Sequence, residues 1–317
     1  MKATKKEFRD GQVSKQEYLE KMYEVHAHLF DYSELMKDTN VSKIVIEDDT
    51  VVVTCRNSGV KLICAKGDVR SVPLTIFNLD DYEADELNMQ LQLIKDGDTV
   101  FDIGGNIGWY ALHVAQKYPS STVCSFEPLP PTFEQLRSNI RINGAQNITA
   151  NNIGFSDSAG EVEFFIDPAI SGNASMVNVA EKEHVQVFRC RVETLDSYVS
   201  STSAKVDFIK CDVEGAELFV FRGGINTLKN QQPIVFTEML RKWSAKFSYH
   251  PNDIIEFFKP LGYTAFTILP PPILTQLNTN LKLRKFDLVD EDTVETNYFF
   301  LHHEKHAGII SRFVEPS

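Results

Sequence analysis

The chain has 317 residues and a formal net charge of −12. Its hydrophobic fraction of 43%, with 22 phenylalanines, is enough for a sizeable core and argues against disorder of the whole chain. The acidic balance argues against a nucleic-acid partner, because proteins that bind nucleic acids usually carry a basic patch.

The five cysteines are scattered and never spaced as CxxC, which argues against a zinc ribbon and a thioredoxin-type site. This cysteine usage fits a reducing cytoplasm, which is the predicted location. Residues 1–7 are charged and no apolar run follows them, so the sequence predicts no signal peptide. No run of about 18 apolar residues occurs, and we expect no membrane span.

The N-terminal quarter differs in pattern from the rest of the chain. Residues 5–38 carry apolar positions at helical spacing, which predicts one or two amphipathic helices. Their apolar stripe could pack on the main domain or on a second subunit, so a homo-oligomer through this region is left open. Residues 41–77 alternate apolar runs with turn residues and predict antiparallel hairpins. We expect residues 1–78 to form an extension and residues 79–317 the main domain.

From about residue 84 the pattern alternates between helix and strand, which predicts an α/β fold with a mostly parallel sheet covered on both faces. Strands are expected over 99–103, 122–126, 148–153, 206–210, 233–237, 263–269 and 296–302. Helices are expected over 85–94, 108–117, 132–142, 216–221 and 251–261. Strand-like runs at 162–165 and 184–192 interrupt the alternation, and residues 270–292 are expected to form a long loop.

The first of these strands ends in a glycine-bearing turn that opens a helix, Asp102-Ile103-Gly104-Gly105-Asn106-Ile107-Gly108. In an open α/β sheet, ligands bind beyond the carboxyl ends of the strands. Acidic residues stand at four such ends, namely Asp102, Glu127, Asp212 and Glu238. Each alone could be an ordinary cap or turn residue, but four in equivalent places indicate a binding site.

The turn does not match the common phosphate-binding loops. Counted from Gly104, the dinucleotide motif requires glycine where Asn106 and Trp109 stand, and no Gly-Lys-Ser or Gly-Lys-Thr follows. A ligand without a pyrophosphate tolerates both residues, and S-adenosylmethionine is such a ligand. Glu127, at the end of the next strand, is placed to accept hydrogen bonds from its ribose hydroxyls.

These motifs resemble those of the FkbM family of S-adenosylmethionine-dependent methyltransferases. The run from Asp102 to Gly108 is similar to the family's DxGANxG motif, with Gly105 in place of the alanine. Phe126-Glu127-Pro128 resembles its Glu-Pro element, the run from Ile209 to Glu217 its IKxDxEGxE block, and Tyr82-Glu83 its Tyr-Glu element. The resemblance covers residues 80–270.

The resemblance implies a class I (Rossmann-like) methyltransferase fold with seven strands, the last antiparallel. It implies that Asp102, Gly104, Asn106 and Gly108 hold the methionine end of the cofactor and that Glu127 holds the ribose. Asn152, Ile153 and Gly154 would then lie beside the adenine. The expected cofactor set also includes Tyr82, Pro128 and Asp212. Members of the family methylate oxygen, and sometimes other heteroatoms, on sugars, polyketides and related small molecules.

A hydroxyl acceptor needs a base or a cation to favour the alkoxide. Asp212, Glu214 and Glu238 are the candidate catalytic carboxylates, with His250 as an alternative base. Asp212 and Glu238 could instead bind a divalent cation such as Mg²⁺. The simpler alternatives are that Glu214 and Glu217 cap the following helix and that His250 is a loop residue. Lys210 would need an acidic neighbour inside a strand.

The acceptor pocket is expected from segments outside the alternating core. Candidates are residues 171–176, the run Arg241-Lys242-Trp243, in which Trp243 could stack on a sugar ring, and Tyr82.

The sequence therefore predicts a methyltransferase that moves a methyl group from S-adenosylmethionine to a hydroxyl of a sugar or another small molecule. Two other functions stay open. One is a non-catalytic S-adenosylmethionine-binding module that acts as an assembly partner through its N-terminal helices. The other is a nicotinamide-dependent oxidoreductase.

Overall fold

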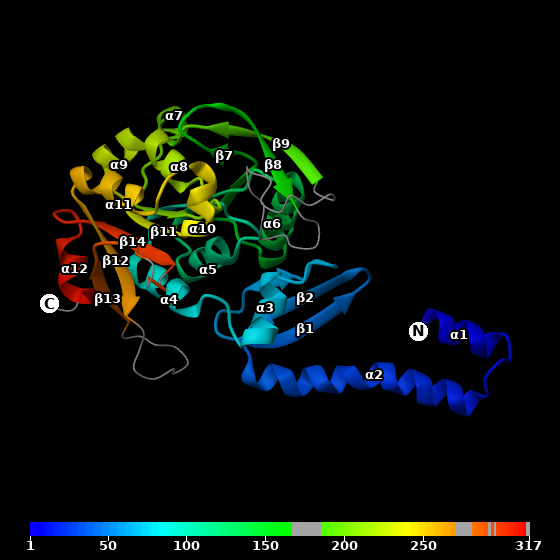
Figure 1. The fold of residues 1–317 in the computed structure, drawn as a ribbon. Coiled ribbons are helices and arrows are strands. Elements are labelled where there is room, and N and C mark those ends of the chain that lie inside the picture. Colours follow the sequence, from blue (N-terminus) through cyan, green and yellow to red (C-terminus); the bar gives the residue numbers. More distant parts are fainter. Residues whose placement is uncertain (167–185, 270–280, 291–292, 295, 315–317) are drawn as a thin grey trace.

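The computed structural model describes residues 1–166, 186–269, 281–290, 293–294 and 296–314. Its centre is a sheet of eight strands in the order β13-β12-β14-β11-β10-β4-β5-β6 (Figure 1). The strands in chain order are β4 (Thr99–Ile103), β5 (Thr122–Phe126), β6 (Ile148–Asn151), β10 (Phe208–Cys211), β11 (Ile234–Glu238), β12 (Tyr263–Leu269), β13 (Lys282–Phe286) and β14 (Asn297–His302).

The strand directions confirm the class I methyltransferase fold expected from the sequence. Strands β6, β5, β4, β10 and β11 pair in parallel, and β14 runs antiparallel between β11 and β12. The sheet has one strand more than expected, because β13 pairs antiparallel with β12.

Strand β13 corrects the prediction of a long loop over residues 270–292. Leu281 and Leu283 are buried, but Lys282, Arg284 and Lys285 surround them with charge and hide the alternation. Pairing of Leu283 with Ile268 fixes the strand on the sheet edge. The three prolines at 270–272 lie outside the described residues.

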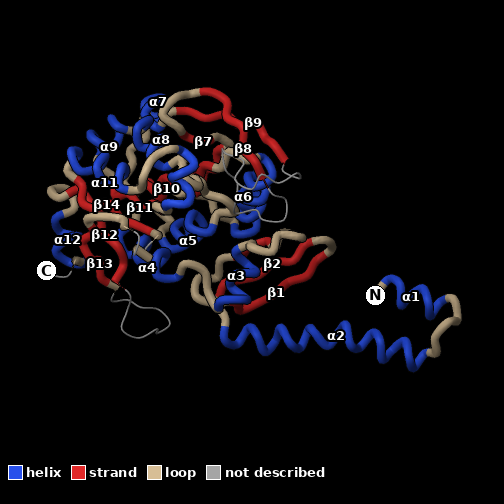
Figure 2. Tube along the Cα trace, in the orientation of Figure 1, coloured by secondary structure: helices blue, strands red, loops and turns tan. Residues whose placement is uncertain are grey.

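Helices cover both faces of the sheet, and each face has its own apolar cluster (Figure 2). Residues of α4 (Ala84–Leu93) and α5 (Trp109–Lys117) pack with Val100 on one face. Residues of α7 (Leu195–Thr202), α8 (Glu217–Gly223), α9 (Ile225–Gln231) and α11 (Asn252–Phe258) pack with Phe101 on the other. Val100 and Phe101 can serve opposite faces because neighbouring strand residues point to opposite sides.

Along the chain, helix α6 (Pro130–Asn143) connects β5 to β6, and α10 (Arg241–Ser244) follows β11. Helix α12 (Ala307–Phe313) follows β14. A second sheet, of order β7-β9-β8, contains the strand-like runs predicted between residues 155 and 198. Its strands are β7 (Gly154–Phe155), β8 (Gly160–Ile166) and β9 (Gln186–Glu193).

The N-terminal region contains the predicted helices and hairpins. Helices α1 (Lys2–Arg9) and α2 (Lys15–Asp38) precede an antiparallel sheet of β1 (Val41–Glu47), β2 (Thr50–Cys55) and β3 (Lys61–Ile63). Hairpins were expected up to residue 77, and this is wrong for its last part, because α3 (Val72–Leu79) is a helix. Pro73 sits in its first turn, where a missing N–H costs no hydrogen bond.

The N-terminal sheet docks on the main domain through α6. Asn139 accepts a hydrogen bond from the Ile63 N–H (2.9 Å) and donates one to the Ile107 carbonyl (2.8 Å). Val53 and Leu62 belong to the same apolar cluster as Leu112 of α5. The sheet therefore shares a core with the main domain, and a boundary at residue 78 stays a prediction. None of the helices in the described ranges is long and apolar enough to cross a bilayer.

Candidate active site

The turn after β4 has the backbone geometry that its glycines allow. Gly104, Asn106 and Gly108 have φ values of 76°, 47° and 92°. A Cβ on Gly104 would lie 1.8 Å from the Asp212 carbonyl oxygen. Glycine at position 104 therefore lets the turn pass directly against the end of β10.

Glu127, immediately after β5, is a buried carboxylate held by backbone groups. Its Oε2 accepts a hydrogen bond from the Asn106 N–H (3.1 Å) and its Oε1 one from the Leu129 N–H (3.0 Å). Burial raises the pKa of Glu127 to about 7, although both hydrogen bonds oppose the rise. Each carboxylate oxygen keeps a further lone pair, so Glu127 can accept two more hydrogen bonds from a ligand.

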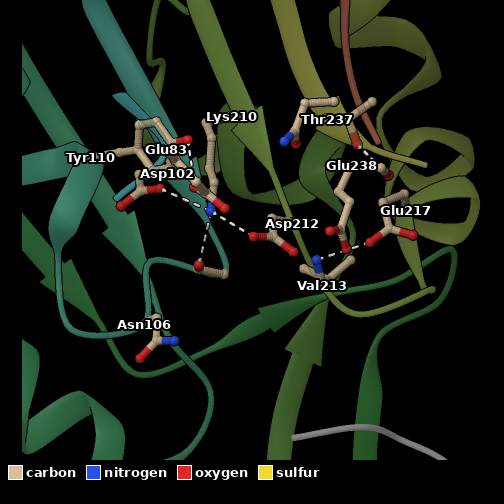
Figure 3. Close-up of polar contacts among 12 residues, drawn as sticks. Glu83, Asp102, Asn106, Tyr110, Lys210, Asp212, Val213, Glu217, Thr237 and Glu238 are labelled. Carbon is tan, nitrogen blue, oxygen red and sulfur yellow. Dashed lines mark hydrogen bonds and ion pairs between the residues drawn. The ribbon is translucent and has the colours of Figure 1, made fainter. Parts of the chain in front are cut away.

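Lys210 is the cation of the site, and it is buried in β10. Its Nζ lies 3.3 Å from Asp212 Oδ2, 3.3 Å from the Gly104 carbonyl oxygen and 3.9 Å from Asp102 Oδ1 (Figure 3). Burial lowers the pKa of Lys210, but the carboxylates around it outweigh that effect and hold the pKa above its ordinary value. The acidic neighbour expected for this lysine is confirmed.

The sheet register brings these groups together. Lys210 stands opposite Asp102 in the pairing of β10 with β4, and Asp102 stands opposite Ser125 in the pairing of β4 with β5. The Ser125 hydroxyl donates to Asp102 Oδ2 (3.0 Å). Asp102 is thus held between Lys210 of β10 and Ser125 of β5, and it fixes the end of β4 at which the turn begins. Its pKa is raised by burial, against the opposing effects of Lys210 and Ser125.

Tyr110 connects Lys210 to Glu83, the residue before α4. The Lys210 ammonium lies 5.2 Å from the centre of the Tyr110 ring, and the Tyr110 hydroxyl donates to Glu83 Oε2 (2.7 Å). Burial raises the pKa of Glu83. Among the predicted site residues neither Glu83 nor Tyr110 appeared. A lysine in an apolar strand was the signal that further polar groups must surround it.

Glu214, which precedes α8, and Glu217, the first residue of α8, have different roles. Glu217 Oε1 accepts hydrogen bonds from the N–H groups of Val213 (3.0 Å) and Gly215 (3.1 Å), so this side chain shapes the loop. Glu214 lines the cleft, and its backbone has a positive φ of 54°. Its buried Oε2 accepts no hydrogen bond from the described residues. Burial, followed by the charges of Asp212 and Glu217, raises the pKa of Glu214.

Glu238, at the end of β11, lines a small cavity together with Glu83, Lys210 and Asp212. Burial, with the charges of Asp212 and Glu214, raises its pKa. His250 lies apart from both cavities. Its Nδ1 accepts a hydrogen bond from the Asn252 N–H (3.2 Å) at the start of α11. This contact matches the loop role that was the alternative for His250.

No group of three or more His, Cys, Asp or Glu residues is arranged to hold a metal ion within the described ranges. Asp212 is paired with Lys210 instead. The suggestion of Mg²⁺ at Asp212 and Glu238 therefore gains no support.

The main cleft opens at the carboxyl ends of β4, β5 and β10 and encloses about 950 Å³, counting its open mouth. Eight of the predicted residues line it: Tyr82, Gly104, Asn106, Glu127, Pro128, Gly154, Asp212 and Glu214.

The other predicted cofactor residues stand behind the wall of the cleft. Asp102 and Gly108 support the turn, and Ile153 packs with the core cluster that contains Phe155. Asn152 donates to the backbone carbonyls of Glu127 (2.8 Å) and Pro128 (2.9 Å), and so fixes the loop that carries them.

Besides Glu214 Oε2, two polar atoms of residues that line the cleft have no hydrogen-bond partner among the described residues. One is an acceptor, Asn106 Oδ1, and the other is a donor, Trp109 Nε1. A ligand that carries both a donor and an acceptor would satisfy these two atoms, since buried polar groups are rarely left unpaired.

The expected acceptor segments are only partly seen. Trp243 is buried, and Lys246 Nζ lies 3.6 Å from the centre of its ring, so the ring is not free to stack on a sugar as expected. Residues 171–176 lie outside the described residues.

Residues 102–265, just over half of the chain, match the family described as the methyltransferase FkbM domain. The chain belongs to the FkbM methyltransferase family. The match begins at Asp102 and includes the glycine turn, Glu127 and the Asp212 loop, all of which the sequence motifs had indicated.

Three relatives match shorter parts of the chain than the family model does. "Methyltransferase 1" of Beauveria bassiana is 29% identical over 147 residues, covering 40% of this chain and 59% of the relative. "Hexuronic acid methyltransferase AglP" of Haloferax volcanii is 29% identical over 150 residues, covering 47% of this chain and 59% of the relative. "31-O-demethyl-FK506 methyltransferase FkbM" of Streptomyces tacrolimicus is 34% identical over 93 residues, covering 28% of this chain and 35% of the relative. The chain thus spans 59% of the length of the first two.

Gly105 occupies the position at which the FkbM motif has alanine. A Cβ on Gly105 would lie 2.0 Å from Ser125 Oγ and 2.9 Å from Asp102 Oδ2. The Ser125–Asp102 hydrogen bond therefore fills the space that an alanine methyl group would need.

We expect Gly105→Ala to lower the free energy of unfolding by about 1–3 kcal/mol through overpacking. Ser125→Ala should cost about 1 kcal/mol for the lost hydrogen bond. Because Ser125→Ala frees the space, the double variant should lose at least about 0.5 kcal/mol less than the sum of the two. Urea unfolding of the four proteins measures this, and strict additivity would contradict the steric explanation.

Proposed function

We propose that this protein transfers a methyl group from S-adenosylmethionine to a hydroxyl group of a sugar or another small molecule. The observation that carries the proposal is the cleft at the ends of β4, β5 and β10, with the backbone-held carboxylate of Glu127 on one side and the Lys210–Asp212 pair on the other. Membership of the FkbM methyltransferase family supports it.

The cleft suits the two polar ends of S-adenosylmethionine. The ribose diol can donate both hydroxyl protons to Glu127, whose two oxygens each keep a lone pair. At the other end, Asn106 Oδ1 can accept from the ammonium of the amino-acid group and Trp109 Nε1 can donate to its carboxylate. Asn106 and Trp109 stand where a pyrophosphate loop requires glycine, so the residues that argue against a dinucleotide are the ones that fit this donor.

When bound, S-adenosylmethionine supplies a methyl group on a sulfonium, which is an excellent leaving group. The protein has to align the acceptor oxygen, exclude water and receive the hydroxyl proton. Asp212 lines both the main cleft and the small cavity that contains Glu238, so it can face donor and acceptor together. We assign proton acceptance to Asp212, and orientation of the acceptor to Glu214 and Glu238.

The acceptor class is supported by the names of two relatives. One name specifies the 31-O position of a demethylated compound, which points to an oxygen acceptor, and the other specifies a hexuronic acid, which is a sugar acid. The raised pKa values of Glu214 and Glu238 also suit a neutral acceptor, since protonated carboxyl groups can both donate to and accept from a hydroxyl.

Glu127 provides a test of the donor. Hydrogen bonds from a ribose favour the ionised carboxylate, so the pKa of Glu127, about 7 in the free protein, should fall on binding. Affinity for S-adenosylhomocysteine should then be constant above pH 7 and weaken below it, by up to about tenfold per pH unit.

In calorimetric titrations from pH 5.5 to 8, Glu127→Gln should bind more weakly at pH 8 and lose most of this pH dependence. The exposed Glu134→Gln should behave like the unchanged protein. A wild-type affinity that does not vary with pH would remove Glu127 from the ribose site.

Asp212 provides a test of the reaction. Protein incubated with methyl-labelled S-adenosylmethionine and a small-molecule extract should yield a labelled product. Asp212→Asn should form this product at least about 100-fold more slowly, because proton acceptance contributes that much to such steps. The exposed Asp287→Asn is the control. Normal turnover of Asp212→Asn would exclude the assigned role, and binding without any labelled product would indicate a non-catalytic binding module.

A further inference from the structure

Helix α2 projects from the body of the protein, and α1 lies at its far end (Figures 1 and 2). Its 24 residues give it a length of about 36 Å. Met22 is its single buried residue, and α1 has none. Most of the stability of a helix in a protein comes from burial of an apolar face, so α2 lacks its usual source of support.

The apolar residues of α2 form a continuous face at three- and four-residue spacing. Parts of this face are covered within the chain, because Phe8 stacks on Tyr18 with ring centres 4.5 Å apart and Phe77 meets Tyr32 at 5.6 Å. The middle of the face is open. Its exposed fractions are Leu19 55%, Tyr23 65%, Val25 38%, Leu29 59% and Phe30 67%.

The area of this open surface is that of an interaction site. With about 150–250 Å² for each aromatic side chain, the exposed apolar area is on the order of 600 Å². That is at the top of the range for the largest patch on a monomer, roughly 300–600 Å². It also approaches the roughly 800 Å² per partner of a standard protein interface.

The charges indicate which partner fits. Helix α1 has four basic residues and one acidic residue, whereas α2 has three lysines and six acidic residues. Within the chain, α1 lies beside the N-terminal half of α2, where Glu7 pairs with Lys21 (3.7 Å). In the acidic C-terminal half, Glu34 pairs with Lys37 (2.6 Å) and Asp31 with His28 (2.9 Å) of the same helix, and among the described residues no basic helix lies beside this half.

We propose that the open face of α2 is a dimer interface, on which a second copy of this chain docks with its own α2 antiparallel. Antiparallel pairing covers Leu29 and Phe30 with the same region of the partner. It also brings each basic α1 to the acidic end of the other α2 and places the two catalytic bodies at opposite ends. Parallel pairing would instead put the two basic helices side by side. This inference is independent of the proposed reaction.

Sedimentation equilibrium and light scattering of the full chain test the interface. The unchanged protein should be a dimer at micromolar concentration. The double variant Tyr23→Glu/Phe30→Glu puts two carboxylates on the open face of α2. It should weaken dimerisation at least tenfold and leave the thermal unfolding of the main domain unchanged. His28→Glu is the control, because it adds a carboxylate to the exposed opposite face of the same helix.

Charge reversal tests the orientation. Lys5→Glu/Lys6→Glu and Glu34→Lys/Asp38→Lys should each dimerise poorly alone, and an equal mixture at low salt should form mixed dimers. A monomer at every concentration up to 100-fold above the micromolar range would overturn the proposal, as would a dimer unaffected by Tyr23→Glu/Phe30→Glu. A monomer whose α2 binds lipid vesicles would also overturn it, in favour of a membrane surface.

Discussion

One buried ammonium group, that of Lys210, holds the candidate site together. It contacts the Gly104 carbonyl of the turn, Asp212 on the loop after its own strand, and Asp102 on the neighbouring strand. Removing a charge from water is costly unless opposite charges and hydrogen bonds surround it. Each of these three contacts therefore stabilises the lysine and is itself fixed by it.

The parallel sheet makes this arrangement possible. Lys210, Asp102 and Ser125 occupy one row across β10, β4 and β5, so their backbone register sets the distances between their side chains. Because parallel strands end at the same edge, the residues that follow them meet above this row. Glu127 and Asp212 reach the cleft in this way. The row is the rigid base, and the loops above it carry the ligand-binding groups.

The sequence predicted the elements that depend on short-range pattern. Strands β4 and β5 have the expected bounds, and the acidic residues at their ends line or support the cleft. Strand β13 was missed because its buried Leu283 lies between charged residues, and α3 was missed because Val72–Leu79 is apolar without a clear helical period.

Side-chain roles were harder to predict than elements, since they depend on contacts between distant segments. Trp243 looked like a sugar platform, but Lys246 covers its ring. Tyr110 meets Lys210 and Glu83 across three segments of the chain. The spacing of residues in one sequence does not encode such contacts. The oddity of a lysine in a buried strand was the one local sign of them.

The most direct measurement compares Lys210→Met with Lys205→Met in unfolding and in binding of S-adenosylhomocysteine. Lys205 is exposed and pairs with Asp207 at 2.7 Å, so its loss should cost at most about 1 kcal/mol. Loss of Lys210 should lower the free energy of unfolding by about 3–5 kcal/mol and weaken binding, because the buried carboxylate of Asp102 and the half-buried carboxylate of Asp212 lose their cation. Equal stability and equal binding of the two variants would contradict the central role of Lys210.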